Sequence, residues 1–370
     1  MRPMIVAALR SPIGTAGHAL AGVDVTGLAA PVLARVAEQA ADLGRPDEVV
    51  LGNCMGPGGD PARVAALAAL GADVPAVSVD RQCGSGLAAI EIGAGLVHAG
   101  AGLVLAGGVE SASTAPWRMW PPSTGEQPRR YLRAPFAPAG FADPDMGLAA
   151  DELAASRGVD RCAQDEYAAR SHRRAWRTAS TGGFADEIVP VAGLERDERP
   201  RPGMSAARLA RLPATYREAG TVTAGNSCGI NDGAAVVALV PDEAGVPGLR
   251  ILATASAGVD PALPGIGLVP AVRKALYRAG VGLAHIDVIE FNEAFAGQVL
   301  ACCRDLDLDP ERICPEGGAL ALGHPWGASG AVLAVRLFTQ MIRRGTGRLG
   351  LAAIAIGGGQ GVAMVVEASR

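Results

Sequence analysis

The stretch VDRQCGSGLAA, residues 79–89, places a cysteine directly before two glycines that one serine separates. Residues 77–79 (VSV) predict the end of a buried strand, and residues 87–98 have the small, apolar composition of a buried helix. We therefore expect Cys83 at the mouth of that helix, where exposed N–H groups favour a thiolate over a thiol. The alternative at this point is a small buried cysteine that only fills a gap in the core.

The composition is that of a large globular protein. The chain has 370 residues, of which 49% are hydrophobic and 19% charged, enough for two or three domains. Aromatic residues make up only 4%, which argues against stacking platforms for nucleic-acid bases. The net charge of −4 argues against a polyanionic partner. We therefore expect no nucleic acid among the partners.

Several other classes of site are disfavoured by what the sequence lacks. Lys274 is the only lysine, and no Gly-Lys-Ser/Thr segment of a phosphate-binding P-loop occurs. The seven cysteines contain no CxxC pair, which predicts reduced thiols in a cytoplasmic protein and no metal site. The apolar stretch 87–108 is interrupted by Glu91 and His98, so we expect a helix followed by a strand rather than a membrane span.

The chain divides into three zones of different composition. Residues 1–114 alternate short strands with helices of small residues, and the same alternation returns after about residue 220. Residues 115–219 are richer in proline, arginine, aspartate and tryptophan, and predict an inserted, loop-rich subdomain with one charged helix, RCAQDEYAARSHRRAWRTAS. The segments CGSGLAAIEIGAGLVHAG and GASGAVLAVRLFTQMIRRG resemble each other, which favours an internal duplication.

A dinucleotide fingerprint is the competing interpretation of the opening stretch. GSGLAA matches the pattern G-x-G-x-x-A, and Glu110 ends the next predicted strand, as a dehydrogenase would require. The context disagrees, because residues 80–83 intervene between the strand and the first glycine. A dehydrogenase is therefore the weaker hypothesis.

A cysteine nucleophile needs a base and a set of donors for the developing oxyanion. Of the five histidines, His172 is expected in solvent, His98 lies near a helix end, and two others lie in ordinary loop or strand-entry segments. His324 differs, because glycines surround it in GGALALGHPWGASG and Pro325 favours an extended backbone before it. This segment can bring an imidazole close to a ligand; the alternative is a glycine-rich structural turn.

Six segments resemble motifs of the thiolase family, in the same order and at similar spacing. They are DRQCGSG, AGGVESAS, GTVTAGNSCGINDGAA, NEAFA, GGALALGHPWGASG and IGGGQG. The segment AQDEYAARSHRRAW also resembles the helix of that family's loop domain. The similarity extends from about residue 10 to residue 364.

This resemblance implies an α/β protein with the thiolase fold, in which two similar αβ halves form a layered αβαβα core. Residues 1–114 and 220–247 would form the N-terminal half, residues 115–219 an inserted loop domain that covers coenzyme A, and residues 248–370 the C-terminal half. The implied activity is that of an acyl-CoA acyltransferase of the acetyl-CoA C-acetyltransferase type. Its substrates would be coenzyme A thioesters, with no bound cofactor, and it would assemble as a homodimer or homotetramer.

The resemblance also implies residue roles. Cys83 would accept the acyl group, His324 would activate it, and Asn292 would position a water for the enolate of the second substrate. The N–H groups of Cys83 and Gly357 would form the other oxyanion hole. Arg201 suits a phosphate of the nucleotide, although it could equally be one more solvated arginine. The positions that match coenzyme A contacts are Arg201, Ala224, Cys228, Ile230, Ala294 and Phe295.

The largest departure from the family pattern is Ala355. Members that make or break carbon–carbon bonds usually carry a second cysteine there, which moves the α-proton of the second acyl group. Alanine cannot do so, and the three cysteines at 302, 303 and 314 offer no obvious substitute. Three explanations stay open: a natural acyltransferase whose decarboxylating, amine or alcohol nucleophile needs no such base, an engineered thiolase, or a non-catalytic scaffold protein that binds coenzyme A.

Smaller departures surround the expected substrate. Cys228 replaces a serine that usually contacts the pantetheine arm, Asp145 stands where many members have histidine, and Asp80 replaces an asparagine. They bear on the preferred acyl chain more than on the use of coenzyme A.

Overall fold

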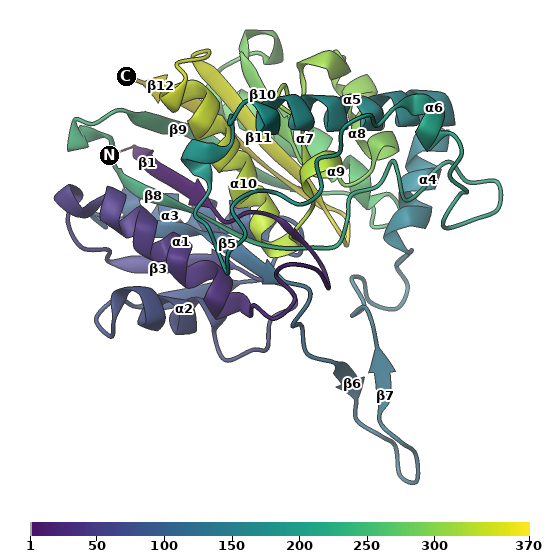
Figure 1. Cartoon of the computed structure of the whole chain (residues 1–370), viewed down its shortest axis with the longest axis horizontal. Coiled ribbons are helices and arrows are strands. Elements are labelled where there is room, and N and C mark those ends of the chain that lie inside the picture. The colour runs from purple at the N-terminus through teal and green to yellow at the C-terminus, as the bar shows by residue number, and fades with distance from the viewer. Residues whose placement is uncertain (1) are drawn as a thin grey trace.

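The computed structural model describes residues 2–370 and is built around one large mixed sheet with helices (Figure 1). The strand order is β10-β11-β12-β9-β1-β8-β5-β3-β4, and the short β2 pairs with β8. The α/β class expected from the alternation of elements is confirmed. The strands of this sheet are β1 Pro3–Arg10, β2 Gly14–Thr15, β3 Glu48–Gly52, β4 Ala76–Val79, β5 Val104–Ser111, β8 Asn231–Pro241, β9 Gly248–Gly258, β10 Val288–Phe291, β11 Leu349–Ile356 and β12 Gln360–Ser369.

The same strand order occurs twice in this sheet. The sequence β3-β5-β8-β1 in the first half corresponds to β10-β11-β12-β9 in the second. In each half the first two strands are parallel, and the next two pairs are antiparallel. Strands β1 and β9 join the halves through Met4 opposite Arg250 and Ile5 opposite Leu249. This repeated topology supports the internal duplication expected from the sequence.

Three large apolar clusters fill the spaces between the helices and the sheet. One lies between the first half-sheet and α1 and α2, and includes Leu28 and Val236. A second surrounds α3 and α10 and includes Leu87 and Leu333, and a third packs α7 and α8 on the second half-sheet. Helices α3 and α10 therefore lie between the two half-sheets, which gives the predicted αβαβα arrangement. The helices are α1 Val25–Gln39, α2 Pro61–Leu70, α3 Ser85–His98, α4 Met146–Ser156, α5 Arg161–Ser180, α6 Ala206–Leu209, α7 Leu268–Ala279, α8 Ala296–Leu306, α9 Ala319–Leu322 and α10 Trp326–Phe338.

The glycines of the two similar segments are explained by the contact between α3 and α10. A Cβ added at Gly86 would lie 2.8 Å from the carbonyl oxygen of Gly327, and one added at Gly330 would lie 2.4 Å from the amide nitrogen of Leu87. The two helix backbones therefore touch, and only glycine leaves room for that approach. Because Gly86 lies inside α3, the GSG run is a helix-packing motif rather than a dinucleotide turn.

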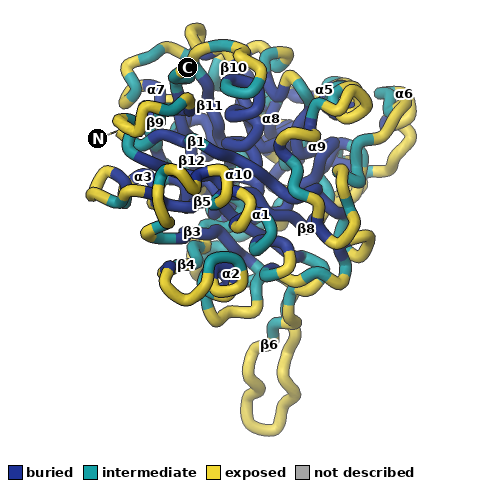
Figure 2. Tube along the Cα trace, turned by 60° about the vertical axis from the view of Figure 1, so that its left-hand side comes forward, coloured by how far each residue is buried: buried dark blue, intermediate teal, exposed yellow. Residues whose placement is uncertain are grey.

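The chain between β5 and β8 forms α4, α5, α6 and a two-stranded hairpin. The hairpin strands, β6 Arg118–Trp120 and β7 Arg129–Tyr131, project away from the body of the molecule (Figures 1 and 2). The predicted charged helix is confirmed as α5. Buried ion pairs fix this inserted segment to the first half-sheet and to the central helix α10: Glu187 Oε1 lies 2.8 Å from Arg10 Nε of β1, and Glu187 also pairs with Arg336 of α10.

Two further expectations meet the structure at this level. Strand β4 exists, but it is the edge of the sheet and Val77 is 43% exposed, so the prediction of a buried strand was wrong. Strand β4 is exposed because it pairs with β3 along one edge and has no neighbouring strand in this sheet along its other edge. No helix within residues 2–370 has the length and apolar character needed to cross a membrane.

Candidate active site

Cys83 lies directly before Gly84, the N-cap of α3, as the opening stretch predicted. The backbone before it is strained, since Gln82 has φ +47°, and a turn follows in which Ser85 N donates to Gln82 O at 3.0 Å. The backbone N–H groups of Gly357 and of Cys83 itself act on the Cys83 sulfur and lower its pKa. Gly357 follows β11, so the nucleophile and one of its donors come from the two different halves.

The helix mouth does not by itself make Cys83 a thiolate. Burial raises the pKa of Cys83 to about 11, although the Gly357 and Cys83 N–H groups pull it down. The free-energy penalty of burying a charged sulfur is larger here than the stabilisation that the backbone N–H groups give to the thiolate. The expectation of a resting thiolate was therefore wrong, and the Cys83 thiol needs a base to become a nucleophile.

His324 supplies a neutral imidazole next to this thiol. It lies between α9 and α10 in an extended segment that pairs with Ile230, and its backbone N–H donates to Asn231 Oδ1 at 3.0 Å. Nδ1 of His324 lies 2.6 Å from Ser329 Oγ, and Nε2 lies 3.5 Å from Asn292 Nδ2. Burial lowers the pKa of His324 to about 4, so the imidazole is free to accept a proton at neutral pH.

One cavity of about 120 Å³ joins these groups. Seven of the residues predicted for the site line it: Cys83, Cys228, Ala294, Phe295, His324, Ala355 and Gly357. The rest of the wall is mostly apolar and consists of Met146, Ala149, Ala150, Pro264, Gly265, Gln298, Trp326 and Ile356. A thiol, an imidazole and backbone donors in an apolar cavity form a site for covalent acyl transfer.

Comparison with known proteins agrees with this geometry. Family models for the thiolase N-terminal domain and the thiolase C-terminal domain match residues 3–243 and 247–368. The chain belongs to the thiolase family. An acetyl-CoA acetyltransferase of Pseudomonas aeruginosa is 43% identical over 390 residues, with 98% of each chain covered. A beta-ketoadipyl-CoA thiolase of the same species is 41% identical over 391 residues, with 97% of each covered.

A solved structure extends the likeness to the fold of this thiolase. The crystal structure of the Bacillus anthracis acetyl-CoA acetyltransferase superimposes with a TM-score of 0.92 at 38% sequence identity. The match covers 100% of this chain and 99% of that one. The thiolase fold expected from the six motifs is therefore confirmed over the full length.

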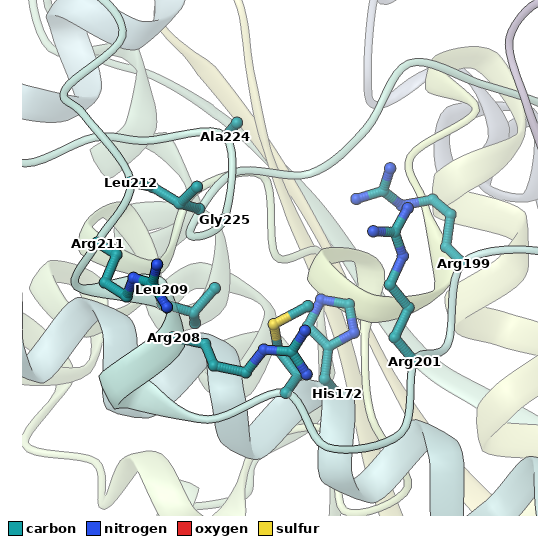
Figure 3. Close-up of a pocket in the computed structure, with 10 residues that line it drawn as sticks. His172, Arg199, Arg201, Arg208, Leu209, Arg211, Leu212, Ala224 and Gly225 are labelled. Carbon is teal, nitrogen blue, oxygen red and sulfur yellow. The ribbon is translucent and has the colours of Figure 1, made fainter.

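Arg201 and Ala224 line a second, larger cavity of about 620 Å³ (Figure 3). Its wall carries four arginines, Arg199, Arg201, Arg208 and Arg211. His172 of α5 also lines this cavity. The expectation that His172 is solvated was wrong, because its side chain is only 5% exposed. Burial, together with the Arg199 and Arg201 cations, lowers the pKa of His172 to about 4, so the histidine adds no charge at neutral pH.

Two of the predicted positions lie outside both cavity walls. Ile230 is 56% exposed, and its backbone pairs with His324 rather than its side chain facing the cavity. Asn292 is buried behind the cavity, where its amide faces His324. Asn292 therefore acts on the cavity only through the imidazole or a molecule held beside it.

Three of the cysteines lie in the core, away from the active-site cavity. Cys302 and Cys303 lie in the buried face of α8, and Cys314 is buried beside the Phe291 carbonyl oxygen, 3.2 Å from its sulfur. None of these three lines the active-site cavity, whereas Cys228 does. Ala355 lines the active-site cavity with a methyl group.

Glu110, which the dehydrogenase hypothesis needed, has a structural role. Its carboxylate accepts the N–H groups of Cys54 at 3.1 Å, Met55 at 3.0 Å and Gly327 at 3.0 Å. Because Glu110 is fully buried under these bonds, it cannot reach a ribose. The fold and the site together remove the reason for the dehydrogenase alternative.

Sequence reasoning missed several residues of the site. Ser329, which holds Nδ1 of His324, comes five residues after it, on the first turns of α10. That spacing within one glycine-rich motif was a signal that could have been used. Met146 and Gln298 come from α4 and α8, and no local pattern connects them with Cys83.

Proposed function

We propose that this thiolase is an acyl-CoA C-acyltransferase of the acetyl-CoA acetyltransferase type, which forms its acyl-enzyme on Cys83. The observation that carries this proposal is that Cys83, His324 and Gly357 line one small cavity, where the N–H groups of Gly357 and Cys83 favour negative charge at the sulfur. Relatives that are about 40% identical over almost their whole length are named for this chemistry. The substrates are coenzyme A thioesters, and no bound cofactor takes part.

Acylation begins with the neutral pair of Cys83 and His324. As the sulfur attacks the thioester carbonyl, its proton passes to the imidazole, whose lowered pKa keeps it unprotonated beforehand. The oxygen that becomes negative is then stabilised by the N–H groups of Cys83 and Gly357, the donors already aimed at this point. The proton on His324 is delivered to the departing coenzyme A sulfur, which leaves the acyl group on Cys83.

The second acyl group is handled on the other side of the cavity. We assign Asn292 to hold a water beside His324, because its amide lies 3.5 Å from Nε2 and is buried. That water and the imidazole would stabilise the enolate oxygen of the second substrate. The apolar wall formed by Met146, Ala149 and Phe295 favours short, uncharged acyl chains.

Coenzyme A would extend from the small cavity to the arginine-lined one. Cys228, Ala294 and Phe295 line the inner cavity, where the pantetheine arm would pass, and Ile230 is exposed nearby. Arg201 and Ala224 line the outer cavity, where guanidinium groups suit the phosphates of the nucleotide.

The three-part division of the chain, its assembly and its location are also part of this proposal. We retain residues 115–219 as the domain that covers coenzyme A, between halves formed by 1–114 with 220–247 and by 248–370. A homodimer or homotetramer is supported by the projecting hairpin, on which Trp117 is 74% and Met119 52% exposed. A cytoplasmic location is supported by seven cysteines that are all free thiols within residues 2–370.

The test is intact-protein mass spectrometry after mixing with a panel of short acyl-CoAs. We expect one acyl adduct that peptide mapping places on Cys83 and that Cys83→Ala removes. Cys162→Ser serves as the control, because Cys162 is exposed on α5 and away from the cavity. An adduct that survives Cys83→Ala, or no adduct with any acyl-CoA, would overturn the proposal.

A further inference from the structure

Few groups on the wall of the active-site cavity can hold or release a proton. Of the side chains that line it, only those of Cys83, His324 and Cys228 titrate in water at accessible pH. The rest are apolar side chains, glycines, one amide and one indole. A proton transfer inside this cavity therefore has three possible partners.

The proposed reaction already occupies two of these partners. Once the acyl group sits on Cys83, its sulfur is part of a thioester and can accept no proton. In the thiolysis direction no coenzyme A sulfur leaves at this stage, so His324 still holds the proton it took from Cys83 and faces the oxygen of the departing acyl unit with Asn292. The carbon atom that gains or loses a proton needs a third group, and Ala355 offers only a methyl group.

Cys228 is fixed in position between the two segments that carry the site. Its backbone N–H donates to Ala294 O at 2.9 Å, and the preceding Ser227 pairs with Phe295. Two residues later, Ile230 pairs with His324. Strand-like pairing on both sides holds the Cys228 backbone against the Asn292 loop and the His324 segment, so its place on the cavity wall is defined by the backbone.

The surroundings of Cys228 suit a thiol that serves as an acid. Burial and the nearby Cys83 raise the pKa of Cys228 to about 12, so the sulfur carries a proton at neutral pH. Glu293 also disfavours its thiolate. Arg199, a buried cation whose Nε has no hydrogen-bond partner, acts in the opposite direction and would stabilise a thiolate formed in passing.

We propose that the Cys228 thiol moves the proton of the carbon–carbon bond step, in place of the thiol that is missing at residue 355. This proposal rests on the proposed thiolase function. When the Cys83 sulfur attacks the 3-oxo carbonyl of a 3-oxoacyl-CoA, the bond between C2 and C3 breaks and its electron pair stays on C2. Cys228 gives its proton to C2, which releases acetyl-CoA and leaves the shortened acyl group on the Cys83 sulfur.

The proton balance closes when coenzyme A enters. The Cys228 thiolate takes the proton of the incoming coenzyme A thiol, whose sulfur attacks the thioester carbon on Cys83. As that thioester breaks, Cys83 leaves as a thiolate and recovers its proton from His324. Both cysteines and the histidine end in their starting forms, and no oxidant or further reactant is needed.

The experiment separates the two half-reactions in the full-length protein. Acylation of Cys83 by acetyl-CoA is followed by intact-protein mass spectrometry, and thiolysis of acetoacetyl-CoA by ultraviolet absorbance. The unmodified chain is compared with Cys228→Ser, Cys228→Ala, the double variant Cys228→Ser with Ala355→Cys, and Cys162→Ser as the matched control on an exposed cysteine.

We expect thiolysis by Cys228→Ser to fall about 10²–10⁴-fold, the usual worth of a positioned acid or base. Acylation should fall by less than about tenfold, since serine keeps the size and polarity of the side chain. Ala355→Cys in the Cys228→Ser background should recover at least about tenfold in thiolysis, because it returns a thiol to the same cavity. A purely structural role for Cys228 would not allow that rescue.

Three results would overturn the assignment: thiolysis by Cys228→Ser within about threefold of the unmodified chain, equal losses in both half-reactions with no rescue, or acylation without any thiolysis in the unmodified chain. If Cys228→Ser does not fold, Cys228→Ala is judged by the same criteria. Deuterium uptake at C2 of acetyl-CoA in heavy water tests the same proton transfer in the unmodified chain. A failure of acylation itself would instead count against the proposed function.

Discussion

Nδ1 of His324 lies 2.6 Å from Oγ of Ser329, five residues further along the chain. Both side chains are buried, and Ser329 belongs to α10, a helix that packs in the centre of the molecule. The hydrogen bond therefore ties the orientation of the imidazole to the buried central helix of the fold. With Nδ1 engaged, Nε2 is the nitrogen left for Asn292 and for the substrates.

Removing the imidazole should slow acyl transfer without unfolding the chain. We expect His324→Ala to reduce the rate of Cys83 acylation about 10²–10⁴-fold, because the Cys83 thiol then lacks a base. Rapid-quench mass spectrometry measures this rate, and circular dichroism checks the fold. His285→Ala, an exposed histidine, is the control. A loss below about threefold would make His324 a structural turn residue.

Ser329 should act by positioning His324 rather than by touching a substrate. We expect Ser329→Ala to lower the acylation rate by about tenfold, since one hydrogen bond to the imidazole is worth roughly 1–1.5 kcal/mol. Ser329→Thr keeps the hydroxyl and should restore most of the rate. A value of kcat that stays constant in Ser329→Ala, while KM alone changes, would contradict this role.

The protonation states of the site predict an unusual pH profile for alkylation of Cys83. Because burial raises the pKa of the Cys83 thiol to about 11, its reaction with iodoacetamide should be slow at pH 7 and rise up to about that value. A free cysteine, with a pKa near 8.5, should reach its plateau about 2.5 pH units earlier. Peptide mapping of alkylated Cys83 against pH measures this, and a plateau below pH 9 would contradict it.

Arg201 should matter for coenzyme A but not for its pantetheine fragment. We expect Arg201→Ala to raise KM for acetyl-CoA about 10–100-fold, since a hydrogen bond to a charged group contributes roughly 1.5–3 kcal/mol. The KM for acetyl-pantetheine, which lacks the nucleotide phosphates, should stay the same. Arg45→Ala, on an exposed arginine paired with Asp73, is the control. Equal effects on both substrates would show that Arg201 does not bind the nucleotide.

Local pattern predicted the parts of the fold and site that depend on short segments. Cys83 at the start of α3, the extended backbone at His324 and the charged α5 all follow from neighbouring residues, and the structure has them. The expectations that failed depend on burial by distant residues. His172 looks solvated beside charged neighbours, yet the inserted segment covers it; likewise the pKa of Cys83 is raised by its burial among segments that lie far apart in the sequence.

The place of Cys228 shows the same limit from another side. Nothing within TAGNSCGI says that its sulfur meets the cavity of Cys83 and His324, because the three segments are joined only by pairing in three dimensions. Sequence comparison with the family pattern identified the position as unusual. The proposal that Cys228 transfers a proton came instead from the composition of the cavity wall, which holds few side chains that can titrate.

The ion pairs of Glu187 with Arg10 and Arg336 have a consequence for how the molecule melts. Glu187 belongs to the insertion, Arg10 to the first half-sheet and Arg336 to the central helix of the second half, and all three side chains are buried. If the insertion opened alone, Arg10 would lose both of its carboxylate partners, Glu187 and Asp197, and would stay buried as an unpaired charge, at a cost of about 3–5 kcal/mol. The insertion therefore does not loosen ahead of the rest. We therefore expect the insertion, the sheet and α3 to melt together on heating, as a single cooperative unit.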